Sequence, residues 1–173
     1  MRSYVLTGLA CAGLFVAVSA RAQQAPEAIS QPVPEVMPFD VPYGTPINLA
    51  TARKVLAAAE AEAQKRNWKM NCAVVEPTGD LVAFEKMDGA QYASIQIAQE
   101  KARTAARFRR STKIFFDVVK GGNPYVLGFP GMLPSEGGFP LIQAGKLIGA
   151  VGCSGGTGNQ DATVAMAGTE MVK

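Results

Sequence analysis

The sequence predicts a mixed α/β domain of the α+β type: a mostly antiparallel sheet covered by helices, in the order α-β-β-α-α-β-β-α. Two observations carry this prediction. Apolar residues recur at helical spacing in four segments, and short apolar runs occur in two pairs, each pair flanking a turn. Strands joined as hairpins pair antiparallel, which leaves the helices to cover the sheet. A chain of 173 residues fits one such domain.

The N-terminal region divides into two predicted segments that precede the folded domain. Residues 1–22 have the features of a signal peptide: Arg2, an apolar run over residues 5–18, and the cleavage pattern Ala20-Arg21-Ala22. The apolar run is too short to span a membrane comfortably. We therefore expect a periplasmic or secreted protein, cleaved near Ala22 and without a membrane span.

Residues 23–47 form a proline-rich arm that leads into a predicted domain over residues 48–173. Six prolines fall in this arm, a density that excludes a helix or a central strand: Pro26, Pro32, Pro34, Pro38, Pro42 and Pro46. Two interpretations are open. The arm is either an extended segment that lies over a neighbour, or a disordered spacer.

The net charge and the cysteine content limit the binding partners and the cellular compartment that the sequence allows. Cleavage after Ala22 removes two of the 17 basic residues and none of the 14 acidic ones, so the net charge becomes 15 minus 14, or +1. Such a charge gives no long-range attraction to nucleic acid or to an anionic membrane. Cys72 and Cys153 then remain, and an even pair in an oxidising compartment favours a disulfide.

The first half of the domain is predicted to contain two helices and a hairpin. A helix begins after Asn48, a good N-cap residue, and extends to about residue 67. Residues 70–89 form a hairpin that turns at residues 77–80, which read Pro-Thr-Gly-Asp. Residues 94–110 form a helix with Ser94 as its cap and a face of small residues: Ala98, Ala102, Ala105 and Ala106. Such a face lets a backbone approach closely.

The second half is predicted to contain a helix, a loop, a hairpin and a final helix. Residues 111–122 form a short helix that Gly121 and Gly122 terminate. The glycine- and proline-rich stretch 128–140 is expected to be a loop. Residues 139–153 form a hairpin that turns at Ala144 and Gly145, and residues 160–172 form a helix with Asp161 in its first turn.

One motif raises the question of catalysis. Residues 152–156 read Gly-Cys-Ser-Gly-Gly and fit the G-x-S-x-G pattern of α/β-hydrolases, with Ser154 as the nucleophile. The chain contains no histidine to act as the base, and the predicted sheet is antiparallel. A Ser154–Lys101 pair stays open as an alternative. Two cysteines after cleavage are too few for a common zinc site.

The chain resembles the GlcG/HbpS family, which includes the C-terminal domain of PduO-type proteins. The resemblance extends from about residue 49 to 172 and rests on four motifs in the family's order: Met87-Asp88-Gly89, Lys101-Ala102-x-Thr104-Ala105, Gly137-Gly138-x-Pro140 and Gly149-Ala150-x-Gly152-x-Ser154-Gly155. It implies a profilin-like domain, a homo-oligomer, and haem binding, with haem degradation proposed for some members. In a profilin-like sheet the strands of Cys72 and Cys153 are antiparallel neighbours, which implies that the two residues pair.

A ligand is expected where the motif segments meet. The candidate residues come from the first hairpin, the second long helix and the exit of the last strand: Met87, Asp88, Tyr92, Lys101, Thr104, Ser154 and Asp161. The Lys101 ammonium is expected to reach a carboxylate, either that of Asp88 or that of a ligand. Arg103, Arg107 and Arg110 share one helix face, as a solvated surface or as partners of haem propionates.

Haem binding without histidine needs another axial ligand. The candidates are Met87, Met132, Tyr92, Tyr125 and Lys101. Three function classes remain open at this point: an exported binding protein for haem or a similar tetrapyrrole, a haem-degrading or other small-molecule enzyme, and an oligomeric accessory protein without a ligand.

Overall fold

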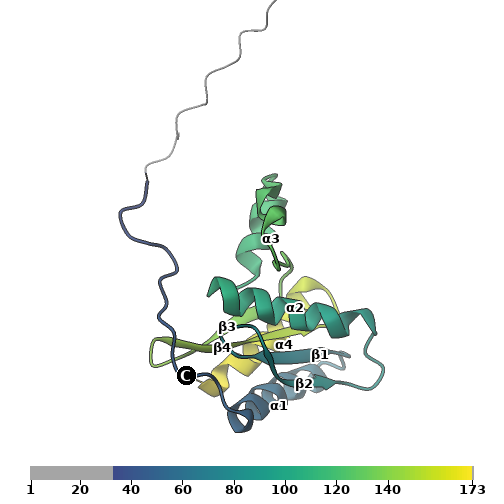
Figure 1. Ribbon diagram of the computed structural model, residues 1–173. Helices are drawn as coiled ribbons and strands as arrows, with labels where there is room; N and C mark the ends of the chain where they lie inside the picture. The colour runs from purple at the N-terminus through teal and green to yellow at the C-terminus, as the bar shows by residue number, and fades with distance from the viewer. Residues whose placement is uncertain (1–32, 173) are drawn as a thin grey trace, which may run out of the picture. The chain divides into compact units, whose positions relative to one another are not determined.

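The centre of the fold is a four-stranded antiparallel sheet with the strand order β2-β1-β4-β3. It is seen in a computed structural model, which describes residues 33–172 (Figure 1). The strands are β1 (Asn71–Val75), β2 (Leu81–Lys86), β3 (Gly138–Gln143) and β4 (Lys146–Ser154). The predicted α+β class is confirmed. The predicted signal peptide lies outside the described residues.

The helices cover both faces of the sheet in the predicted order. Their bounds are α1 (Leu49–Lys65), α2 (Ala93–Phe108), α3 (Lys113–Lys120) and α4 (Gly158–Thr169), with 3-10 turns at Pro124–Gly128 and Glu170–Val172. Helices α1 and α4 pack together on one face, and α2 packs on the other (Figure 1). Asn48 caps α1 as predicted, because its side chain accepts a hydrogen bond from the Thr51 amide at 2.8 Å.

The sheet separates two apolar clusters. On the α1 and α4 face, aliphatic side chains of both helices meet alternate residues of β1, including Cys72 and Val74. On the α2 face, the predicted alanine surface meets Ala73, Val75 and Ala150. Gly152 of β4 explains how close this second contact is, because a Cβ atom there would collide with the backbone of Ala98 and Ala102. Small residues on both sides therefore bring α2 directly onto β4.

Some local predictions need correction. Ser94 does not cap α2: Tyr92 occupies the cap position, and Ser94 is buried inside the first turn. β3 begins at Gly138, inside the predicted loop, and α4 begins at Gly158, where Thr157 and Gln160 form a capping box.

Arg103 and Arg107 of α2, and Arg110 just after its end, are neither a plain solvated face nor free for a ligand. The Nε atoms of Arg103 and Arg107 donate to the turn carbonyls of Gly79 and Thr78, at 3.3 and 2.9 Å. The Arg110 guanidinium lies 3.7 Å from the ring centre of Phe39 in the proline-rich arm. Together these contacts tie α2 to the first hairpin and to the arm.

Part of the predicted arm is hydrogen-bonded to the sheet. The Gly44 amide donates to the Leu147 carbonyl at 2.7 Å, and the Leu147 amide donates to the Pro42 carbonyl at 2.8 Å. Tyr43 and Leu147 form a parallel bridge. In the described part of the chain, the arm therefore takes the extended form from Pro42 to Ile47, rather than that of a spacer.

Candidate functional site

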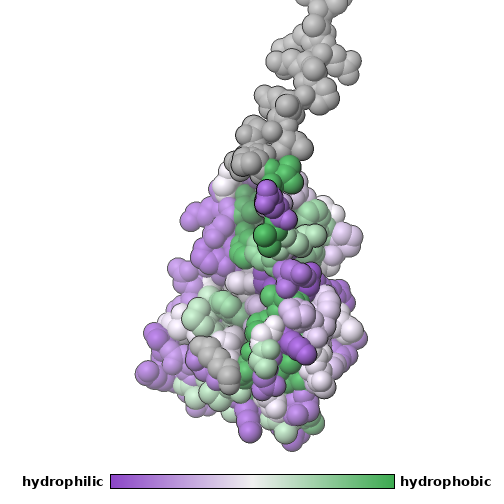
Figure 2. All heavy atoms as spheres, turned by 90° about the vertical axis from the view of Figure 1, so that its left-hand side faces the viewer, coloured by the Kyte–Doolittle hydropathy of each residue, from purple (hydrophilic) through white to green (hydrophobic). Residues whose placement is uncertain are grey.

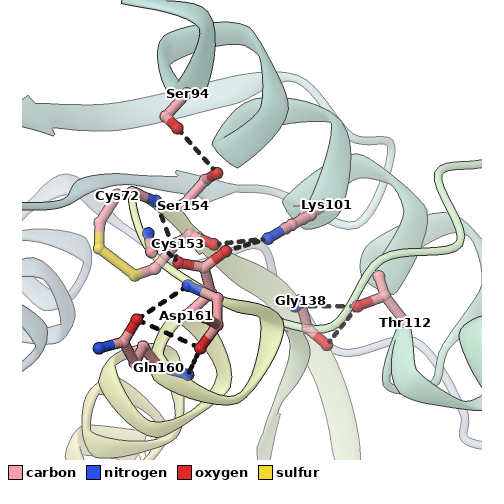
Figure 3. Close-up of polar contacts among 12 residues, drawn as sticks. Cys72, Ser94, Lys101, Thr112, Gly138, Cys153, Ser154, Gln160 and Asp161 are labelled. Carbon is pink, nitrogen blue, oxygen red and sulfur yellow. Dashed lines mark hydrogen bonds and ion pairs between the residues drawn. A yellow bond between two sulfur atoms is a disulfide. The ribbon is translucent and has the colours of Figure 1, made fainter. Parts of the chain in front are cut away.

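A buried ion pair joins the two helical layers around the end of β4 (Figure 3). The Lys101 ammonium of α2 lies 2.6 Å from Oδ2 of Asp161 in the first turn of α4. The same ammonium donates to the Cys153 carbonyl at 3.2 Å. The side chains of Lys101 and Asp161 are only 1% and 4% exposed. Since α2 and α4 lie on opposite faces of the sheet, this pair is a direct polar link between them.

The other oxygen of Asp161 organises the turn that leaves the sheet. Its Oδ1 accepts hydrogen bonds from the amides of Gly155 and Gly156, at 3.0 and 2.9 Å. Burial raises the pKa of Asp161, while Lys101 and these amides oppose that rise. Burial lowers the pKa of Lys101, against the pull of Asp161. Asp161 thus has hydrogen-bond partners for both of its carboxylate oxygens in a buried site.

Lys101 therefore does not occupy the predicted position. It contacts Asp161 rather than Asp88, and its burial leaves it out of reach of a ligand in solution. The reason is the close approach of α2 to Gly152, which directs the long lysine side chain past the end of β4 into the interior. Lys101 is accordingly removed from the candidate axial ligands of haem.

Ser154 and Thr104 are also buried and hydrogen-bonded. The Ser154 hydroxyl donates to the Ser94 hydroxyl at 3.1 Å. Thr104 Oγ1 accepts from the Leu133 amide at 2.9 Å and so braces the loop before β3. Among the described residues, no hydrogen bond joins Ser154 to Lys101. Ser154 is the last residue of β4 and its hydroxyl is bonded to that of Ser94 rather than to a base, so the arrangement does not provide an activated nucleophile.

The three candidates of the first hairpin lie apart from the buried pair. Asp88 is exposed, and Tyr92 is 82% exposed, with the Lys86 ammonium 5.4 Å from its ring centre. Met87 lines a surface hollow instead. Of the seven predicted site residues, the structure brings Lys101, Ser154 and Asp161 together at the end of β4. Of the remaining candidates for the axial ligand, Met132 is half-buried and Tyr125 is exposed.

Two hollows on the surface offer room for a ligand. The hairpin pocket, of about 360 Å³, lies between α1 and the first hairpin and is lined by Leu56, Glu60, Met70, Cys72, Phe84, Glu85, Lys86 and Met87. The α4 groove, of about 610 Å³, follows the outer face of α4 and includes Lys113, Phe139, Ala162, Met166 and Ala167. Sequence reasoning missed this groove. The sequence did contain a signal for it: Ala162 and Met166 are spaced so that both apolar side chains lie on one face of the last helix.

A disulfide joins two neighbouring strands of the sheet beside the buried ion pair. Cys72 of β1 and Cys153 of β4 are register partners, and their sulfur atoms are bonded in the structure with the Cα atoms 4.2 Å apart. Cys153 also supplies the carbonyl that Lys101 contacts. Within residues 33–172, no group of three or more metal-ligating side chains is present, and no helix is long and apolar enough to cross a membrane.

The architecture and the buried pair define a small α+β sheet domain with helices on both faces, not an α/β-hydrolase. The chain belongs to the HbpS-like family, since residues 47–170 match the family described as "Haem degrading protein HbpS-like". Protein GlcG of Escherichia coli strain K12 is 43% identical over 103 residues, which are 60% of this chain and 77% of GlcG. The predicted family is confirmed.

Solved structures agree with this assignment. The crystal structure of HbpS has a TM-score of 0.69 and 26% identity, covering 80% of this chain and 98% of HbpS. The crystal structure of a PduOC:Heme complex has a TM-score of 0.67 and 25% identity, covering 75% of this chain and 96% of that one. The second of these proteins is described as bound to haem.

Proposed function

We propose that this chain is a haem-binding protein and that haem occupies the α4 groove. Kinship with HbpS and with the protein of the PduOC:Heme complex supports haem as the ligand. The observation that carries the placement is the groove itself, which combines the larger volume with an apolar part of its lining that includes a methionine. Ligand sites are usually concave and mostly apolar, with a few polar groups that fix orientation.

The residues of the α4 groove fit the parts of a haem. Phe139, Ala162 and Ala167 offer apolar surface to a flat macrocycle, and Met166 brings a half-exposed thioether, a known haem ligand. Lys113 is a basic residue at the same groove, where its ammonium already pairs with Asp117 and lies 3.5 Å from Glu136, so a propionate would join this network as a further anion. When bound, haem would supply an iron centre whose properties depend on its axial ligand.

Three glutamates, Glu62, Glu136 and Glu170, line the groove, and the cationic partners of Glu62 and Glu136 reduce the repulsion that these two would exert on a propionate. Glu62 is bonded to Arg66, and Glu136 lies 3.5 Å from the Lys113 ammonium. In the hairpin pocket the situation differs: it is smaller, and a buried oxygen of Glu85 has no hydrogen-bond partner. An anionic haem would bring its propionates toward an uncompensated carboxylate there, which favours the α4 groove.

Substituting Met166 tests this placement. Met166→Leu keeps the apolar volume and removes the sulfur, so we expect haem titration to give a shifted Soret band and at least tenfold weaker binding. Met171→Leu is the matched control, because Met171 is similarly exposed and does not line the groove. Met87→Leu tests the axial candidate predicted from the sequence.

Other results of the same titration would contradict the proposal. If Met166→Leu retains the wild-type spectrum and affinity while Met87→Leu loses them, the haem lies in the hairpin pocket. If the wild-type protein gives no saturable band, the haem function itself is wrong. Loss of the band with release of product under a reductant would instead indicate the haem-degrading activity named for the family.

We also infer that the chain forms a homo-oligomer. The support is a cluster of exposed large apolar residues on α3 and the turn that follows it: Ile114, Tyr125, Leu127 and Phe129. On the face shown in Figure 2, hydrophobic side chains form a band between hydrophilic ones. Light scattering is expected to give a multiple of the single-chain mass at micromolar concentration. A single-chain mass throughout that range would contradict this inference.

Export to the periplasm or the medium, with cleavage near Ala22, is part of the same proposal. It is supported by the signal-peptide pattern of residues 1–22 and by a disulfide, a bond that persists in oxidising compartments.

A further inference from the structure

The hairpin pocket contains a carboxylate, that of Glu85, which forms no ion pair with any of residues 33–172. We propose that this pocket is a second binding site, which takes a small organic ammonium ion with an apolar chain of a few carbon atoms. This site is supported by the position of Glu85, the chemistry of the other lining residues, and the orientation of the neighbouring lysine. It does not depend on haem binding at the α4 groove.

Glu85 lies on the covered face of β2. It is the register partner of Cys72, so its side chain is on the face of the sheet that α1 covers. Its Oε2 is buried and has no hydrogen-bond partner in the described part of the chain. Burial raises the pKa of Glu85, the charge of Glu60 raises it further, and Arg53 of α1 lowers it. A bound cation stabilises a buried carboxylate that lacks hydrogen-bond partners more than it stabilises a hydrated carboxylate.

The nearby lysine does not supply that cation. Lys86 follows Glu85 directly and lines the same pocket, yet its ammonium donates to the Met87 carbonyl at 3.3 Å. It also lies over the ring of Tyr92. No ion pair joins Lys86 to Glu85 among residues 33–172. The pocket therefore keeps an acidic end.

The other residues that line the pocket determine which chemical groups and what size the ligand should have. Glu60 of α1 places a second carboxylate in the pocket, and one of its oxygens accepts from Gln64 at 2.8 Å. Leu56 and the sulfur-containing residues Met70, Cys72 and Met87 supply apolar surface in the same pocket. Thioethers adapt to ligands of different shape. The volume of about 360 Å³ is at the lower end of the range for small-ligand sites, which suits a short chain.

Three probes with the same hydrocarbon chain separate the contribution of charge to binding from that of hydrophobicity. The full protein, free of haem, is titrated with hexylammonium, hexanol and hexanoate while amide chemical shifts are recorded by NMR. We expect saturable shifts on α1 and β2 with hexylammonium, at least tenfold weaker binding of hexanol, and no binding of hexanoate. Equal affinity for hexylammonium and hexanol would overturn the proposal, because the carboxylates would then contribute nothing.

Substitutions assign the site. Glu85→Gln keeps the shape of the side chain and removes the charge, so hexylammonium binding should weaken at least tenfold. Asp117→Asn on α3 removes an equal charge far from the pocket and should leave binding unchanged. If Glu85→Gln binds like the wild type, the proposal is wrong. Should that variant fail to fold, Glu60→Gln replaces it: reduced binding supports the site, and unchanged binding overturns it.

Two further comparisons keep this site distinct from the haem site. Met166→Leu should bind hexylammonium as the wild type does, whatever its effect on haem. Glu85→Gln should leave the haem spectrum unchanged. Loss of hexylammonium binding in Met166→Leu would mean that the shifts do not report the hairpin pocket, and would overturn the proposal even if haem binds as expected.

Discussion

Replacing Asp161 with alanine is expected to lower the free energy of unfolding by about 3–5 kcal/mol. The substitution leaves the Lys101 ammonium buried with one carbonyl partner and without its counter-ion. It also removes the oxygen that accepts from the Gly155 and Gly156 amides at the start of α4. Chemical denaturation of the variant and the wild type measures the difference directly.

An exposed ion pair of similar length is the matched control. Lys113 and Asp117 on α3 are 2.7 Å apart, against 2.6 Å for Lys101 and Asp161, and their side chains are 54% and 51% exposed. Asp117→Ala should therefore cost at most about 1 kcal/mol. Equal losses for the two alanine variants would show that burial does not set the strength of the Lys101–Asp161 pair.

The double variant Lys101→Met with Asp161→Leu separates two explanations of that loss. Replacing both charges by apolar side chains is often neutral or stabilising, because no buried charge is left alone. Recovery of most of the stability would show that the single variant suffers from an unpaired ammonium. If the double variant is as unstable as Asp161→Ala, the amide contacts of the turn are the larger contribution.

Elements with strong local signals could be predicted from the sequence. Asn48 before an apolar helical repeat indicated the start of α1, and Ala144-Gly145 indicated the second hairpin turn, where both residues have positive φ angles of 48° and 75°. The cap of α2 was wrong because Ser94 forms a contact with Ser154, 60 residues away. Propensity describes the capping preference of serine but not a tertiary partner.

The site was harder to predict because its contacts are long-range. Lys101 and Asp161 are 60 residues apart, and nothing in their spacing shows that α2 and α4 meet past the end of β4. The motifs include Lys101 but not Asp161, which was expected as a first-turn carboxylate of the last helix and as a ligand residue rather than as the partner of Lys101. Glu85 could not be singled out from the sequence, because its burial depends on the position of α1.

Removing the disulfide with the double variant Cys72→Ala and Cys153→Ala is expected to destabilise the protein by roughly 4–5 kcal/mol. The two residues are 81 positions apart, so the bond closes a long loop and strongly restricts the unfolded chain. Because Cys72 and Cys153 are already register partners in the sheet, the folded state should keep its structure without the bond. Denaturation of the variant beside the oxidised wild type gives the difference.

A thiol count decides whether the bond forms in the protein as exported. The sequence has three cysteines, Cys11, Cys72 and Cys153. Protein recovered from an oxidising compartment and unfolded without reductant should show one thiol if residues 1–22 remain, and none if they are removed. Three or two thiols would contradict the bond. Because a reductant breaks the Cys72–Cys153 bond, reduction should lower the stability of the wild type and leave the alanine variant unchanged.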